Sequence, residues 1–237
     1  MRILTNRRHR GGLALGLIVL LAALLLALPA GAQEPQRFDE KVRELFFAGF
    51  AGNQDALQRG TAMCEEELAA DPDHPGALVW QASGWFYQSS FAFAEGDPET
   101  GMALYNNAVA QFDRAVALAP NSLETLIPRA AVYLSVAPYV AHAPTRNQLL
   151  ETVVGDYTKV LELRAPVFQS LTAHSRGELL GAMAEALWLL EKRDEAGVYL
   201  DRMIAELPDS PYALMAQQQL DEPETRAQLT CLGCHKY

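Results

Sequence analysis

The sequence lacks the short motifs that mark many enzyme active sites. It has no G-x-S-x-G nucleophile turn, no glycine-rich phosphate loop and no H-E-x-x-H zinc helix. Its Asp and Glu residues are scattered over segments expected to be solvated helix faces. We therefore expect a binding protein and not an enzyme.

Clusters of basic residues are also missing. The chain has 19 Lys and Arg residues against 29 Asp and Glu residues, a formal net charge of −10. Such a surface repels the phosphates of a nucleic acid, which excludes nucleic acid as a partner. An acidic surface favours solubility and association with basic partners.

The one long apolar run is too short to span a bilayer comfortably. Leu13–Leu28 covers 16 residues, whereas a membrane helix needs about 20. Four arginines precede this run, and small residues of the A-x-A type follow it at 29–32. That order predicts a secretory signal peptide over residues 1–32 and a periplasmic protein. An uncleaved signal would instead anchor the chain, so membrane contact is expected only through that anchor or through a partner.

Strand-like runs longer than four or five residues are scarce, and the chain is expected to be all-helical. Pro120, Pro166 and Pro208 each follow a set of residues with the same gaps of four, three and five. Such a set is one face of a helix followed by a stop. The three sets are Ala108, Phe112 and Ala115; Val154, Thr158 and Leu161; and Ala196, Leu200 and Met203.

A second kind of stripe precedes each of these helices. It places a small residue between two large ones, which lets a neighbouring helix approach closely. The three examples are Trp80, Gly84 and Tyr87; Leu126, Ala130 and Tyr133; and Leu180, Ala184 and Leu187. A weaker first unit precedes them and contains Ala48, Ala51, Gly60, Cys64 and Pro72.

This pattern resembles the tetratricopeptide (TPR) repeat, in which antiparallel helix pairs stack on one another. The resemblance covers residues 38–220 and implies about four helix hairpins, two of them elongated, closed by a capping helix near 210–220. A fainter likeness around SSFAFAEGDPETGMALYNNAV is to the T-component of TRAP solute transporters. It implies an accessory role in solute transport.

The TPR resemblance also implies a concave groove that binds a protein partner through the first helix of each pair. Trp85 and Trp188 would be aromatic anchors in that groove, unless they pack against the elongated hairpins instead. The residues placed on this surface are Gln81, Trp85, Gln88, Ile127, Ala131, Leu134, Glu185 and Trp188.

Only three cysteines occur, and two of them form a motif. Residues 231–235 read CLGCH, inside a tail that spans 221–237. Cys-x-x-Cys-His is the attachment signature of a c-type haem: Cys231 and Cys234 form thioethers and His235 is the proximal iron ligand. We therefore expect one covalent haem c. Cys64 falls on a packed helix face and is expected to be a small buried apolar side chain.

Two other interpretations of CLGCH remain open. The cysteines could form a thiol-exchange pair, as in cytochrome maturation, or a metal hook, which would need further ligands. The sixth haem ligand is not assigned; the candidates are His74, His142, His174 and Met215.

Together these observations predict an exported TPR-type scaffold with one haem c at the tail. It would act in electron transfer or in the assembly of a periplasmic redox complex, which could be membrane-bound. The alternatives are a haemless adaptor with a thiol-exchange tail and a TRAP-type accessory protein.

Overall fold

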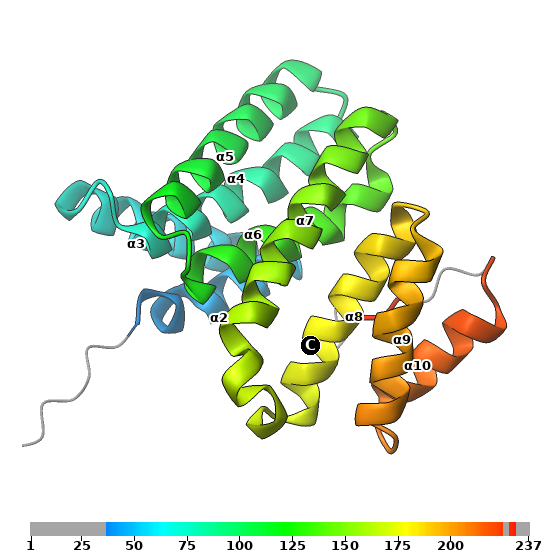
Figure 1. Cartoon of the computed structure of the whole chain (residues 1–237). Coiled ribbons are helices and arrows are strands. Elements are labelled where there is room, and N and C mark those ends of the chain that lie inside the picture. Colours follow the sequence, from blue (N-terminus) through cyan, green and yellow to red (C-terminus); the bar gives the residue numbers. More distant parts are fainter. Residues whose placement is uncertain (1–36, 225–227, 231–237) are drawn as a thin grey trace, which may run out of the picture. The chain divides into compact units, whose positions relative to one another are not determined.

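The computed structural model describes residues 37–224 and 228–230 (Figure 1). The expected signal peptide at 1–32 lies outside this range. Contacts between residues divide the chain into two units, and the second unit, which contains the helices, begins at Phe38. Among the described residues, no helix combines the length and apolarity that a membrane crossing requires.

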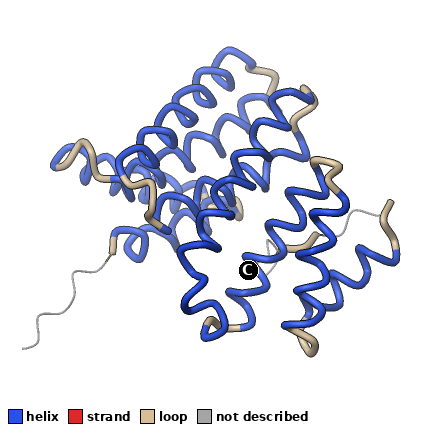
Figure 2. Tube along the Cα trace, in the orientation of Figure 1, coloured by secondary structure: helices blue, strands red, loops and turns tan. Residues whose placement is uncertain are grey.

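The described residues are helical and include no strand (Figure 2), so the prediction of an all-helical chain is confirmed for this part. Two 3-10 helices, η1 (Ala137–Tyr139) and η2 (Ala165–Ser170), flank α7. The α-helices are α2 (Phe38–Phe50), α3 (Gln54–Ala70), α4 (Pro75–Ala94), α5 (Pro98–Leu118), α6 (Leu123–Val136), α7 (Ala143–Arg164), α8 (Ala173–Leu189), α9 (Arg193–Glu206) and α10 (Pro211–Asp221).

Local sequence explains where these helices begin and end. Side chains that accept a hydrogen bond from the first helical turn precede several helices, because the N–H groups there have no partner within the helix. Four helices end two residues before a proline, which cannot continue the helical hydrogen-bond pattern. The capping residues are Asn53, His74, Asp97, Ser122, Thr172 and Ser210, and the prolines are Pro72, Pro120, Pro166 and Pro208.

Consecutive helices pack in pairs. The most extensive helix contacts include α2 with α3, α4 with α5, α6 with α7 and α8 with α9, and α10 packs on α9. The first helices of these pairs also touch in succession: α2 with α4, α4 with α6, and α6 with α8. One buried apolar cluster runs through the whole set.

The predicted packing stripes hold in two of the three units. Ala108, Phe112 and Ala115 of α5 are all fully buried, and so are Ala196, Leu200 and Met203 of α9. Ala184 and Ala196, on the adjacent helices α8 and α9, are buried together in the same cluster.

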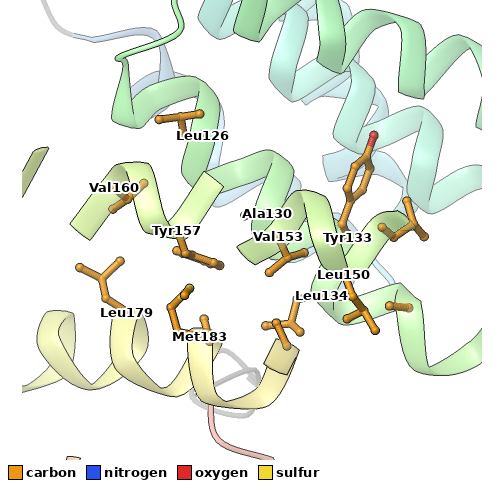
Figure 3. Packing of buried hydrophobic residues seen from close by; sticks show 14 of the residues in the cluster. Leu126, Ala130, Tyr133, Leu134, Leu150, Val153, Tyr157, Val160, Leu179 and Met183 are labelled. Atoms are coloured by element: carbon orange, nitrogen blue, oxygen red, sulfur yellow. The ribbon is translucent and has the colours of Figure 1, made fainter. Parts of the chain in front are cut away.

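The stripe predicted for α7 was wrong by one residue. Thr158 is exposed, whereas Val153, Tyr157 and Val160 are buried between α6 and α8 (Figure 3). Tyr157 brings a much larger apolar area than Thr158, and burying that area is what stabilises the helix orientation. The shared gaps placed a polar side chain where the neighbouring aromatic one fits.

A buried ion pair also holds α7 in place. The Arg129 guanidinium of α6 donates to both carboxylate oxygens of Asp156 on α7, at 2.8 and 2.7 Å. It also donates to Asp113 of α5 at 3.0 Å, so one side chain links three helices. Burial lowers the pKa of Arg129, but the hydrogen bonds and the charge of Asp156 outweigh burial and raise that pKa overall. The guanidinium therefore stays charged.

Removal of this cation should be costly. We expect Arg129→Met to lower the free energy of unfolding by about 3–5 kcal/mol, because it leaves Asp156 buried without its partner. Combining Arg129→Met with Asp156→Leu should recover most of that loss. Urea unfolding followed by circular dichroism measures both variants.

Asp113→Ala is the matched control for this prediction. The Asp113 side chain is 67% exposed, so its removal should change the free energy of unfolding by no more than about 1 kcal/mol. Losses from Arg129→Met and Asp156→Leu that simply add in the double variant would show that the two residues do not act as a pair.

Candidate functional site

A short segment beyond α10 lies against α8 (Figure 1). The Leu229 backbone N–H donates to Oε2 of Glu185 at 3.2 Å, and the Thr230 hydroxyl donates to the same oxygen at 3.3 Å. Leu229 is fully buried within the apolar cluster. Glu185 is itself buried, with 2% of its surface exposed. A carboxylate inside the helical unit thus binds the backbone and side chain of this segment.

A glycine on α8 makes this approach possible. A Cβ atom on Gly181 would lie 2.0 Å from the Leu229 carbonyl oxygen and 3.0 Å from its carbonyl carbon. No side chain fits at such distances, so only glycine lets the segment lie this close to the helix. Gly181 and Glu185 are one turn apart and therefore share a face of α8. We call these two residues the α8 seat.

One turn earlier, α8 receives α10 in the same way. A Cβ atom on Gly177 would lie 2.3 Å from the ring of Tyr212. The Tyr212 hydroxyl donates to Glu178 at 2.6 Å and lies 2.8 Å from Nδ1 of His174. Sequence reasoning missed both close approaches. Their signal was the spacing of Gly177 and Gly181 by four residues, which places two gaps on one helix face.

The residues predicted to line a partner groove lie in different surroundings. Gln81 is buried and accepts a hydrogen bond from Gln111, beside a hollow of about 370 Å³ between α3, α4 and α5. Leu134 is buried in the apolar core. Trp85, Gln88, Ile127 and Ala131 are half-buried.

The last two predicted groove residues lie on α8. Trp188 is half-buried, and the Arg193 guanidinium lies 3.9 Å from its ring centroid. Within the predicted groove set, Glu185 accepts hydrogen bonds from residues 229–230 of the same chain. The groove as a whole stays a prediction.

The three residues of the predicted haem site lie outside the described residues. They are Cys231, Cys234 and His235. Thr230, the residue immediately before Cys231, is described and lies at the α8 seat. Among the residues that the structure describes, no group of three His, Cys, Asp or Glu side chains is placed to hold a metal ion.

The remaining cysteine, Cys64, is a buried side chain, as the sequence predicted. Cys64 is fully buried on α3. Burial raises the pKa of its thiol to about 12, with a smaller contribution from the charge of Glu65. At neutral pH the thiol stays protonated and is a poor nucleophile.

The histidines considered as sixth haem ligands already use one ring nitrogen. Nδ1 of His74 accepts from the Ala77 N–H at 3.1 Å, and Nδ1 of His142 lies 2.9 Å from the Thr145 hydroxyl. His174 lies against Tyr212, as described above. Met215 is partly buried against the apolar cluster.

The chain matches no family model, no curated protein and no solved structure.

The contact at the α8 seat should contribute to stability. We expect Leu229→Ala to lower the free energy of unfolding by about 2–4 kcal/mol, because it removes a fully buried side chain from a packed cluster. Urea unfolding measures the change.

Leu214→Ala on α10 is the control. That side chain is 73% exposed, so we expect a change within about 0.5 kcal/mol. Equal, small effects of the two leucine variants would show that residues 229–230 do not form part of the folded unit.

Proposed function

We propose that this protein is an exported, TPR-type helical scaffold that carries one haem c on its Cys231–His235 motif. It acts in electron transfer or in the assembly of a periplasmic redox complex. The observation that carries the proposal is the burial of Leu229 and Thr230 on α8, directly before the motif.

The arrangement of helices supports the TPR part of the proposal. Helices that follow one another pair, and the first helices of successive pairs touch. The small residues Ala130 and Ala184 are fully buried within these contacts, as a close helix approach requires. Such stacks characteristically bind proteins along one face.

The residue types of the motif fit a haem. Two thiols three residues apart, with an imidazole next to the second, are the donors that covalent attachment and proximal ligation need. Haem supplies one-electron exchange when it is bound, and that chemistry needs no substrate pocket. The chain's own contribution is to hold this donor set beside a rigid helical unit.

The segment at 229–230 brings the chain before the motif against the apolar core of the helical unit. Consecutive Cα atoms are about 3.8 Å apart, and Thr230 is bound to Glu185. The preceding residue, Leu229, lies in an apolar cluster that includes Met203, and a haem on the motif would use that cluster as apolar cover.

The partner in this proposal is a protein. The net charge of −10 favours a basic docking surface and argues against nucleic acid. Trp85 and Trp188 are half-buried, so part of the surface of each residue is accessible to such a partner.

A denaturing gel stained for haem tests this function. When the protein is produced together with a haem-attachment system, thioether bonds should keep its haem through denaturation. Cys231→Ala and Cys234→Ala should each lose most of the stain. His235→Ala should change the absorption spectrum, because the proximal iron bond is lost.

Cys64→Ala is the matched control and should keep full haem stain, because this thiol is fully buried on α3 and is not part of the motif. A colourless wild-type protein under active attachment would refute the haem. If that protein also contained a reducible Cys231–Cys234 bridge, the tail would be a thiol-exchange module instead.

A further inference from the structure

The α8 seat has the properties of a built binding site for an extended chain segment. It combines a buried acceptor, Glu185, with a gap at Gly181 that any side chain would fill. Its occupant supplies a backbone N–H, a hydroxyl and a fully buried leucine side chain. Each of these three groups has a matching feature on the helical unit.

We infer that Gly181 and Glu185 are positioning residues that hold the chain immediately before Cys231 on α8. The group carried by the motif is thereby held at one place on the helical unit instead of moving at the end of a flexible linker. This inference deepens the proposed function and rests on it for the identity of the carried group, haem c.

The contact at the α8 seat shortens the distance over which the motif could move. A flexible chain of roughly ten residues, the length from Asp221 to Cys231, has a root-mean-square span of about 17 Å. Fixing Thr230 at Glu185 reduces the free length to a single residue, about 3.8 Å. A redox group at a fixed place can be presented to a partner in one orientation, which raises the fraction of productive encounters.

The burial of the Glu185 carboxyl group suits this positioning role. A buried carboxylate is costly unless its oxygens accept hydrogen bonds. Two donors, the Leu229 N–H and the Thr230 hydroxyl, converge on its Oε2. Loss of the segment would remove both donors, so the carboxylate itself favours the seated state.

Hydrogen exchange in the full-length protein tests the inference without requiring haem. Gly181→Ala places a methyl group where the Leu229 carbonyl oxygen lies and should displace the segment. We expect the Leu229 amide to exchange at least about tenfold faster than in the wild type, which corresponds to about 1.4 kcal/mol of lost protection. Mass spectrometry of the peptide that contains residues 228–230 measures this rate.

Gly197→Ala on α9 is the matched control. It makes the same chemical change in a neighbouring helix, where the added Cβ meets nothing within 4 Å. It should leave the exchange of residues 228–230 unchanged and raise the melting temperature slightly, because alanine favours the helix. Equal exchange of this segment in Gly181→Ala, Gly197→Ala and the wild type would overturn the inference.

If circular dichroism shows that Gly181→Ala does not fold, Glu185→Gln tests the inference instead. It keeps the shape of the side chain but replaces one carboxyl oxygen by an amide NH2 group, which cannot accept a hydrogen bond. Faster exchange at Leu229, with unchanged exchange in α4 and α5, supports the seat. Unchanged exchange at Leu229 contradicts it.

The haem-loaded protein separates this inference from the proposed function. If both hold, Gly181→Ala keeps the haem in a denaturing gel but lowers its midpoint potential, because a displaced haem is more exposed to water. Gly197→Ala leaves that potential unchanged. If no haem is present, the proposed function is refuted, and the exchange rate of Leu229 still tests the inference about the α8 seat. If haem is retained but the exchange rate is unchanged, only the inference about the α8 seat is refuted.

Discussion

The close approach of two chain segments to α8 is the contact on which the C-terminal part of the fold depends. Gly177 leaves room for the Tyr212 ring and Gly181 leaves room for the Leu229 carbonyl group. Nearly every residue from Gly177 to Leu187 is buried, because α6, α7, α9, α10 and the segment at 229–230 all contact this helix. A helix covered on so many sides tolerates little change in volume.

The middle of the helical unit depends on a different interaction. Arg129 connects α5, α6 and α7 through charged hydrogen bonds, whereas the surrounding contacts are apolar. Apolar packing is non-directional and would allow α7 several rotations about its axis. A bidentate ion pair has one geometry, and it places Asp156 beside the buried Tyr157 on the inner face. We interpret the pair as a device that selects one rotation of α7.

Sequence reasoning recovered the elements whose signals are local. The prolines predicted where helices end, and the stripes in α5 and α9 were confirmed because every residue in them is apolar and buried. It failed at Thr158. The equal spacing of the three sets placed Thr158 on the packed face, although the neighbouring Tyr157 has the larger apolar side chain. Sequence reasoning could not find what occupies the α8 seat, because Glu185 and Leu229 are 44 residues apart and neither forms a recognisable motif with the other. The predicted haem residues lie outside the described residues, and the function stays a proposal.

The sequence separation between Glu185 and Leu229 has a consequence for the order of events during biogenesis. A chain is synthesised from its N-terminus, and α8 precedes residues 229–230 in the sequence. Until then, the carboxylate of Glu185 lacks the two donors that the segment provides. Gly181 and Glu185 share a face only once α8 has formed, so docking of residues 229–230 requires a folded α8. This segment is therefore among the last parts of the described chain to join the helical unit.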